Sequence, residues 1–408
     1  MNILLVNVGD ERIISNNPPL GLAYIAGYIK RYTEDTVKVI DLAVENLESD
    51  FIENFHPDLV GISTLTPTYS KAERVAKKIK EVSSAHICIG GYHVSAFPND
   101  SIDKEWFDSV VVGQGEKCFL EIRNDLLNGV KNIGVRVSEN IDNLDDLPFP
   151  NREIFPLDKY NFRIKGNEAV NILSSRGCRF KCIYCDKSVF GIGIKRRSVR
   201  NIIDEIDYVI EKFGIRGFYF VDDAFTFDNP TVYEFCKLIK DRNIVWRCMT
   251  RADRVTETLI ARMKEAGCYE ISIGVESGDK EILKKIRKGV TKEQISKCFR
   301  LLKKHKIRNK GFFIIGFPWE TEESIDKTIE FAKELDPDRV QFSVAVPFPG
   351  TELRKELHKL NIPVSSNWED YEFTNNKDIN PIYDGLFLSK KQISEKVQEA
   401  KEIFNGKE

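Results

Sequence analysis

The sequence predicts an α/β protein built from two successive units and followed by a small helical cap. Short apolar runs alternate with helical patterns over residues 1–130, and six strand-then-helix repeats follow over residues 166–350. Two prolines flank an aromatic residue within the polar stretch at residues 131–165, which indicates an ordered, extended linker. Residues 351–408 read as a short helix and then a charged helix, and they are the predicted cap.

Length and composition narrow the class of protein. A chain of 408 residues, 42% of them hydrophobic, can bury the cores of two or three domains. Its 61 basic and 63 acidic residues nearly balance, which argues against a nucleic-acid-binding surface. The sequence has no run of 18 apolar residues and no basic start of a signal peptide, so we expect neither a transmembrane helix nor secretion. The nine cysteines favour a reducing cytoplasm over a disulfide framework.

The first unit is predicted to contain five strands of near-continuous apolar sequence. They are Ile3–Val8, Val37–Asp41, Leu59–Ser63, His86–Ile89 and Ser109–Val112, with helices such as Leu20–Arg31 and Ser70–Val82 between them. This alternation predicts a doubly wound, Rossmann-like parallel sheet with helices on both faces. Ligands of such sheets bind at the carboxyl ends of the strands.

Three loops at these carboxyl ends have residues suited to ligand binding. Residues 63–66 are Ser-Thr-Leu-Thr, residues 90–93 are Gly-Gly-Tyr-His, and residues 113–116 are Gly-Gln-Gly-Glu. Glycine lets backbone amides approach a ligand closely, so these loops predict a small-molecule site. The alternative is that Gly90 and Gly91 are ordinary turn glycines.

The second unit is predicted to be a partial barrel of six strand–helix repeats. Its strands are Ala169–Ser174, Gly217–Val221, Val245–Met249, Glu270–Gly274, Gly311–Ile315 and Val340–Val344. Each strand ends in polar or glycine-rich residues, and barrel enzymes place their chemistry at such carboxyl ends. Six repeats instead of eight leave the barrel open, with a wide mouth for a second domain or a large substrate.

Three cysteines follow the first barrel strand with the spacing C-x3-C-x2-C. They are Cys178, Cys182 and Cys185, and thiolates are the preferred ligands of iron–sulfur clusters. A [4Fe-4S] cluster has four irons, so three cysteines leave one iron open. A zinc site is the alternative, but zinc sites normally close with four ligands, and no fourth cysteine or histidine lies nearby in the sequence. The other six cysteines are interpreted as buried small hydrophobes.

This motif resembles that of the radical S-adenosylmethionine (SAM) superfamily, whose core is also an open barrel. In that family the open iron chelates SAM, and electron transfer breaks the sulfonium to give a 5'-deoxyadenosyl radical. The resemblance implies that Tyr184, just before the last cysteine, lies beside the adenine. Residues 313–321 resemble the family's fifth-strand motif, which implies backbone contacts of Gly316 with the adenine. It also implies an external one-electron reductant of the flavodoxin or ferredoxin type.

Charged and hydroxyl side chains at other strand ends complete the predicted SAM site. SAM carries a carboxylate, an amine, a ribose diol and a sulfonium, so acidic, hydroxyl and cationic partners are required. Glu276 directly ends a buried strand, where a carboxylate without a function is unfavourable. For Arg251, a salt bridge with Asp253 or Asp223 is an equally good interpretation. The predicted side chains are Asp222, Arg251, Glu276 and Ser277.

The first unit resembles the cobalamin-binding domain of one radical SAM subgroup. Residues 18–27, 90–93 and 112–116 carry motifs that occur in this order in the subgroup, and the resemblance covers most of the chain. The resemblance implies cobalamin between the two units, over loops with the candidate residues Ser63, Thr64, Gly90, Gly91, His93, Gly113, Gly115 and Glu116. The D-x-H-x-x-G motif that supplies a cobalt-binding histidine elsewhere is absent, because Asp41 is followed by Leu-Ala-Val-Glu. We therefore expect no histidine from that motif on cobalt, and a histidine in the position of His93 more often caps or packs.

Three functions are consistent with this organisation. The first is a cobalamin-dependent radical SAM methyltransferase that methylates an unactivated carbon or phosphorus. The second keeps the fold but performs cyclisation, ring contraction or oxidation, with or without cobalamin. The third is a non-catalytic cobalamin or cluster sensor, against which the cysteine motif and Glu276 argue. The substrate is left open as a small molecule, a lipid or a peptide, and the cap is expected to lie over the barrel mouth and touch it.

Overall fold

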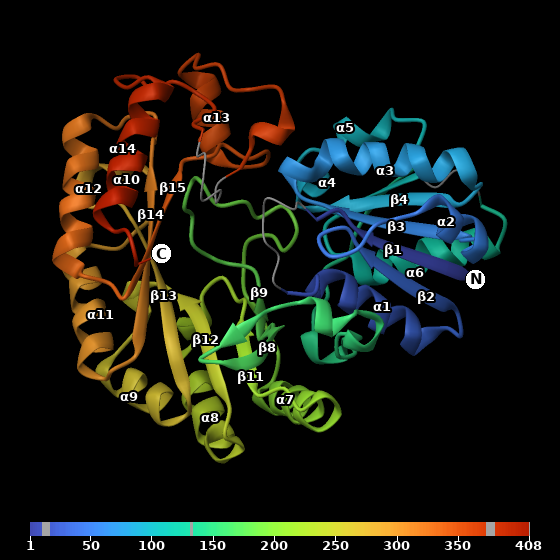
Figure 1. Ribbon diagram of the computed structural model, residues 1–408, viewed down its shortest axis with the longest axis horizontal. Coiled ribbons are helices and arrows are strands. Elements are labelled where there is room, and N and C mark those ends of the chain that lie inside the picture. The colour runs from blue at the N-terminus through green and yellow to red at the C-terminus, as the bar shows by residue number, and fades with distance from the viewer. Residues whose placement is uncertain (10–16, 131–133, 373–379, 408) are drawn as a thin grey trace.

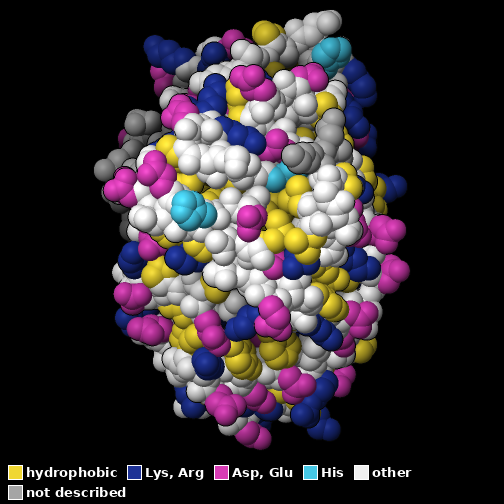
Figure 2. Space-filling view, turned by 90° about the vertical axis from the view of Figure 1, so that its right-hand side faces the viewer, with side chains coloured by type: hydrophobic (Ala, Val, Ile, Leu, Met, Phe, Trp, Pro, Cys, Tyr) yellow, Lys and Arg dark blue, Asp and Glu magenta, His cyan; other side chains and the backbone are white. Residues whose placement is uncertain are grey.

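The computed structural model describes residues 1–9, 17–130, 134–372 and 380–407. These residues form two α/β units side by side, and the C-terminal segment lies alongside the second unit (Figure 1). On the face that Figure 2 shows, acidic and basic side chains are interspersed. None of the described helices is long and apolar enough to cross a membrane.

The first unit is a six-stranded parallel sheet in the order β2-β1-β3-β4-β5-β6. Its strands are β1 (Asn2–Asn7), β2 (Thr36–Asp41), β3 (Leu59–Thr64), β4 (His86–Gly91), β5 (Ser109–Val112) and β6 (Gly134–Val137). Helices α1 (Leu20–Tyr32) and α6 (Gly115–Leu127) pack on one face, and α2 (Ser49–Phe55) and α3 (Tyr69–Val82) on the other. Two short helices, α4 (Tyr92–Ala96) and α5 (Asn99–Ile102), follow β4.

The doubly wound sheet predicted from the sequence is confirmed, with one strand more than expected. Strand β6 escapes the sequence pattern because it is a short edge strand on which Val135 and Val137 are exposed. An exposed edge strand lacks the continuous apolar run that marks a buried parallel strand.

The second unit is a curved sheet in the order β15-β14-β13-β12-β11-β8-β7. Strands β8 (Asn167–Ile172), β11 (Gly217–Phe220), β12 (Val245–Thr250), β13 (Cys268–Glu276), β14 (Arg308–Ile315) and β15 (Arg339–Val344) run parallel, and β7 (Arg163–Ile164) adds an antiparallel edge. The outer layer consists of α7 (Val199–Phe213), α8 (Asn229–Ile239), α9 (Glu257–Glu265), α10 (Lys280–Lys285), α11 (Lys292–Lys304) and α12 (Glu322–Leu335) (Figure 1). Because β8 and β15 stand at opposite ends of the six parallel strands, the barrel is open, as predicted.

Local capping signals set several of the outer helix ends. Ser198 caps α7 by accepting a hydrogen bond from the backbone N–H of Asn201, and Gly214 ends that helix with a φ of 70°. Thr291 begins α11 with a reciprocal capping box. Such caps satisfy backbone groups that a helix end would otherwise leave unpaired, and the caps at Ser198 and Thr291 fix where loops at the barrel mouth end.

The C-terminal segment divides into two parts. Helix α13 (Glu352–Lys359) leads to a short turn in which the Trp368 ring lies 4.9 Å from that of His93 in the first unit. Helix α14 (Lys390–Ile403) packs on the outer side of the barrel, where Lys396 pairs with Asp326 of α12 at 2.7 Å. The predicted cap is therefore helical. We expected it to lie over the barrel mouth, but α14 lies elsewhere. Its apolar face extends the outer helical layer instead, next to β15.

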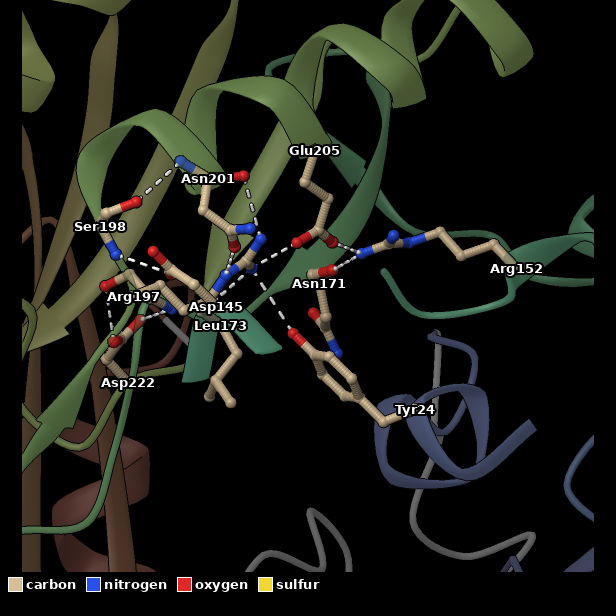
Figure 3. Close-up of polar contacts among 11 residues, drawn as sticks. Tyr24, Asp145, Arg152, Asn171, Leu173, Arg197, Ser198, Asn201, Glu205 and Asp222 are labelled. Carbon is tan, nitrogen blue, oxygen red and sulfur yellow. Dashed lines mark hydrogen bonds and ion pairs between the residues drawn. The ribbon is translucent and has the colours of Figure 1, made fainter. Parts of the chain in front are cut away.

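A buried ion-pair network ties the connector to the barrel beside α1 (Figure 3). Arg152 of the connector lies 2.7 Å from Glu205 of α7, and Arg197 binds the other oxygen of the same carboxylate. The Tyr24 hydroxyl of α1 lies 3.5 Å from Arg197. Burial by itself would raise the pKa of Glu205, but the two arginines outweigh it and hold the pKa below its ordinary value. A fully buried carboxylate is tolerated only with such partners, so this network fixes how the connector sits against the barrel.

Candidate functional site

The barrel encloses a cavity of about 420 Å³ at the carboxyl ends of its strands. All three motif cysteines line it, together with apolar side chains of β14, β15 and the loop after β15. The charged or ionisable side chains on its wall, besides the cysteines, are Tyr184, Asp223, Arg251, Glu276 and Lys288. A ligand in this cavity therefore contacts thiols, two carboxylates and two cations within a largely apolar enclosure.

The cysteine loop leaves the barrel through a small hairpin made by β9 (Ser175–Arg176) and β10 (Lys195–Arg196). Gly177 has a φ of +87°, and a Cβ there would come within 2.6 Å of the Gly193 carbonyl oxygen, so the turn requires glycine. The Lys187 ammonium donates a hydrogen bond to the Phe180 carbonyl and closes the loop. These contacts bring the three thiols to the same wall although they lie on an irregular segment.

The donor set fits an iron–sulfur cluster. Three thiolates can bind three of the four irons of a [4Fe-4S] cluster and leave the fourth open, and the three cysteines line one shared space. Burial raises the pKa of Cys185 to about 12, and the nearby Asp223 carboxylate adds to the shift. Cluster assembly would therefore displace thiol protons, as metal binding to cysteine does in general.

Glu276 reaches the cavity because the backbone is irregular where β13 ends. The register between β13 and β14 shifts between Gly274 and Glu276, and Glu276 has a φ of +68°. Its carboxylate folds back over Gly274, where any Cβ would overlap Glu276 Oε1 and approach Lys288 Nζ to 2.7 Å. Positive φ in a non-glycine residue is uncommon and is concentrated at functional sites.

Lys288 is the partner of Glu276 and was not identified in the sequence. Its Nζ lies 2.6 Å from Glu276 Oε1 and 3.4 Å from the Tyr184 hydroxyl, and both members of the ion pair are buried. Burial, followed by the Glu276 carboxylate, raises the pKa of Tyr184 well above its ordinary value. The available signal was a lysine beside Gly289 in the turn after α10, but single lysines in such turns are usually solvated.

Arg251 both forms a salt bridge and lies at the predicted SAM site, so both interpretations of its sequence position hold in part. It pairs with Asp253 at 3.0 Å, not with Asp223, and donates a hydrogen bond to the Lys288 carbonyl at 2.8 Å. Its guanidinium also lines the cavity, 3.6 Å from the centre of the Phe180 ring and 3.9 Å from Cys182 Sγ. Arg251 is thus a fixed positive charge next to the cysteine loop.

Three of the predicted SAM residues lie behind the cavity wall instead of on it. Asp222 is fully buried and accepts hydrogen bonds from Ser174 and Ser175, so it anchors the start of the cysteine loop. Its neighbour Asp223 lines the cavity instead. Ser277 binds Thr328 at 3.1 Å and holds the turn before α10. Gly316 donates its N–H to Glu320 and packs under α14. Direct side-chain contact with a ligand in this cavity is therefore not available to Asp222 or Ser277.

The first unit contains a second cavity of about 170 Å³ at the carboxyl edge of its sheet. Six of the predicted residues line it, namely Ser63, Gly90, Gly91, Gly113, Gly115 and Glu116. Gly91 and Gly113 have φ values of +110° and +95°, and a Cβ on Gly91 would overlap the Thr64 carbonyl. The cysteine loop completes the wall with Arg176, Val189 and Phe190. The two cavities therefore lie on either side of one loop.

Thr64 and His93 do not line this cavity. The Thr64 hydroxyl is buried against that of Thr68 at 3.0 Å. The His93 ring is fully buried between Tyr69 and Trp368, with Nε2 3.2 Å from Asp100, and burial lowers its pKa to about 4. His93 packs and hydrogen-bonds in place, so it offers no ring nitrogen to a ligand in the cavity.

Comparisons with known proteins match both units. The model of the radical SAM superfamily matches residues 172–332, and the model of the B12 binding domain matches residues 11–123. An "uncharacterized methyltransferase" of Pyrococcus horikoshii, PH0819, is 34% identical to this chain. The matched region covers 98% of this chain and 91% of PH0819. The chain belongs to the radical SAM superfamily, in the group that carries a B12-binding domain. The cofactors of this group are a [4Fe-4S] cluster, SAM and cobalamin, as predicted.

Other relatives differ in the reactions that their names describe. The anaerobic magnesium-protoporphyrin IX monomethyl ester cyclase of Rubrivivax gelatinosus is 29% identical over 86% of this chain and 68% of its own length. The cytidylyl-2-hydroxyethylphosphonate methyltransferase of Streptomyces wedmorensis is 27% identical over 83% of this chain and 77% of its own length. The radical SAM methyltransferase TsrM of Kitasatospora setae shares the fold with a TM-score of 0.72 and 17% identity, over 97% of this chain and 81% of that one. The cobalamin-dependent enzyme OxsB has a TM-score of 0.75 and 17% identity over 91% of this chain, which spans 64% of the OxsB chain.

Proposed function

We propose that this protein is a cobalamin-dependent radical SAM methyltransferase that acts on an unactivated carbon or phosphorus. The observation that carries the proposal is the pair of cavities that share the cysteine loop, one lined by three thiols and one by glycines. A methyl carrier and a radical source must reach the same substrate in turn, and adjoining cavities provide that proximity. Several relatives are named as methyltransferases, which supports the same reaction class.

In this proposal, Cys178, Cys182 and Cys185 hold the cluster on the wall of the barrel cavity. When bound, the cluster and SAM would supply a 5'-deoxyadenosyl radical, and cobalamin would supply the methyl group. Arg251 keeps a positive charge beside Cys182, which stabilises a negatively charged cluster. The surrounding apolar side chains exclude water, so a reactive radical is protected from side reactions.

The Glu276–Lys288 pair would bind the amino-acid end of SAM. That end carries an amine, whose N–H groups match the Glu276 carboxylate, and a carboxylate, which matches Lys288. Both side chains are already buried and paired at 2.6 Å, so much of their desolvation cost is met by folding and not by binding. Tyr184 and the apolar wall are left to contact the adenine and ribose.

Cobalamin would lie between the two units over the glycine-rich loops, with only part of it entering the first-unit cavity of about 170 Å³, and it would be bound mainly by shape and by backbone groups. The glycine-rich loops after β4 and β5 leave room for a large ring to approach the backbone. Since His93 is turned away and buried, we propose that cobalt takes no histidine ligand from this unit. The unit boundaries in the proposal follow the sequence analysis, with a cobalamin unit, a connector, a radical SAM barrel and a C-terminal segment.

The substrate and the electron donor are part of the proposal. The acceptor is a small molecule, a lipid or a peptide, and the donor is a one-electron carrier of the flavodoxin or ferredoxin type. The cyclase of Rubrivivax gelatinosus favours one second candidate, a cyclisation or oxidation on the same fold.

One anaerobic assay separates these functions. The reconstituted protein is incubated with SAM, hydroxocobalamin, a chemical reductant and a panel of acceptors of the classes above. Methyl transfer predicts S-adenosylhomocysteine and 5'-deoxyadenosine together with a product 14 mass units heavier, that is, one methyl group in place of hydrogen. Formation of 5'-deoxyadenosine with an altered but unmethylated product would instead support the second candidate. A protein that binds all three cofactors and cleaves no SAM would contradict both.

A further inference from the structure

Arg176 joins the two cavities although it belongs to the cysteine loop. It lies two residues before Cys178, and its guanidinium crosses to the first unit. There Nη1 donates to Gln114 Oε1 and Nη2 donates to Glu116 Oε1, each at 2.6 Å. All three side chains are buried. Two sequence motifs from different units, the cysteine motif and the Gly-Gln-Gly-Glu loop, therefore meet in one ion-paired contact.

One N–H group of the Arg176 guanidinium, at Nε, has no acceptor among the described residues. The plane of the guanidinium lies beside two aromatic rings, 5.0 Å from the centre of Tyr24 and 5.3 Å from that of Phe190. Arg176 Nε is buried. Arg176, Gln114 and Glu116 all line the first-unit cavity. A buried N–H without an acceptor is costly, so a ligand that brings an acceptor to this wall gains affinity from it.

We propose that Arg176 is a positioning residue that couples occupancy of the two cavities. When the guanidinium shifts slightly toward the first-unit cavity, a ligand there accepts a hydrogen bond from Nε through an amide carbonyl, the acceptor that a corrin ring carries on its side chains. That bond fixes Arg176, and Arg176 fixes the backbone that leads into Cys178. Cluster and cobalamin then stabilise each other, because coupling between two sites is reciprocal. The inference rests on the proposed function for which cofactor occupies each cavity.

A second buried ion-pair network offers a comparison with the Arg176–Glu116 pair. The Glu205 network already ties the connector to the barrel without lining either cavity. Arg152 of that network is therefore a matched control, because it is another buried arginine paired with a glutamate. Replacing both members of the proposed pair, in the double variant R176Q/E116Q, leaves no lone buried charge and so protects the fold.

The test measures the affinity of hydroxocobalamin by anaerobic equilibrium dialysis, with and without the reconstituted cluster. We expect the cluster to tighten binding by about tenfold in the wild-type protein, within the usual range of coupling between sites. In R176Q and R176Q/E116Q the two affinities become equal, while R152Q keeps the wild-type ratio. Reciprocally, hydroxocobalamin slows iron release to a chelator in the wild type and in R152Q but not in R176Q.

Two results overturn the inference, and they differ in what else they overturn. In the first, hydroxocobalamin binds, but the cluster either leaves its affinity for the wild-type protein unchanged or tightens binding to R176Q as much as to the wild type. The coupling role of Arg176 is then wrong, and the proposed function stands. If hydroxocobalamin does not bind the wild-type protein at all, the proposed function is wrong and the inference falls with it.

Discussion

The two cavities differ in what their walls offer to a ligand. The barrel cavity presents three thiols and the charged groups Asp223, Arg251, Glu276 and Lys288. In the first-unit cavity the charged groups on the wall are Glu116 and Arg176, and these are paired with each other. The rest of that wall is glycine and apolar side chain with a few polar groups. One cavity therefore recognises its ligand by charge, and the other by shape and backbone approach, so different substitutions should damage them.

Removal of the three thiols is the largest expected effect. The triple variant C178A/C182A/C185A should fall from about four irons per chain, the content of one cluster, to background, and SAM cleavage should disappear. The control replaces Cys236 and Cys298, which are buried in the barrel core away from the cavity. That control loses stability through lost packing but keeps its iron. A triple variant that retains iron would contradict the assignment.

A single methyl group should damage the first-unit cavity. In Gly91→Ala the new Cβ meets the Thr64 carbonyl at a φ of +110°, a conformation that costs about 1–3 kcal/mol for a side chain. The backbone must shift to relieve this clash, and the shift deforms the wall that receives the corrin. Hydroxocobalamin affinity should therefore fall roughly tenfold or more, a loss of only about 1.4 kcal/mol. Gly129→Ala is the control, because its φ is also positive but its Cβ would meet open space. Equal affinities in the two variants would show that this wall does not bind the corrin.

Two buried carboxylates separate function from stability. Glu276→Gln should weaken SAM binding roughly tenfold to a hundredfold, because hydrogen bonds to charged groups contribute about 1.5–3 kcal/mol. Its melting temperature should fall less than that of Glu205→Gln, because one buried cation and not two loses its carboxylate and the amide still accepts a hydrogen bond from Lys288. Glu205→Gln leaves two buried arginines without a carboxylate, which should cost about 3–5 kcal/mol of stability and leave SAM affinity of the folded protein intact. Titration calorimetry measures the SAM affinity of each variant, and thermal unfolding measures its stability. If Glu276→Gln kept its SAM affinity and lost more stability than Glu205→Gln, Glu276 would serve the fold and not SAM binding.

His93 supplies a smaller, pH-dependent effect. Its folded pKa of about 4 lies below the ordinary value of 6.5, so the unfolded chain binds a proton first as pH falls. Stability should therefore be lost between about pH 6.5 and pH 4, and His93→Gln should lessen the drop in melting temperature between pH 7 and pH 5. The visible spectrum of bound cobalamin should be the same in the variant. A changed spectrum would mean that His93 reaches cobalt.

The sequence was most informative where function depends on local spacing. The cysteine motif and the glycine loops are short, and the structure places their cysteines and glycines on cavity walls. At strand ends the prediction depended on which side a residue faces, and one step along the backbone reverses that side. Asp222 and Asp223 illustrate this, because the first is buried behind the wall and the second lines the cavity.

Other features depend on contacts between distant segments. The bulge at Gly274 turns Glu276 inward and leaves Ser277 behind the wall, and no residue pattern announces such a register shift. Lys288 and Arg176 acquire their roles only from partners that the fold brings to them. For the same reason the position of α14 could not be read from its charged surface, because its buried face is set by the outer layer of the barrel.

The most direct test of the central claim titrates SAM and hydroxocobalamin separately into Glu276→Gln and Gly91→Ala. If the barrel cavity recognises its ligand by charge and the first-unit cavity by shape, each variant should lose affinity for one ligand only. Glu276→Gln should lose affinity for SAM and keep it for hydroxocobalamin, and Gly91→Ala should do the opposite. If both variants lose the same ligand, or if each loses the ligand assigned to the other cavity, the assignment of the two cavities is contradicted.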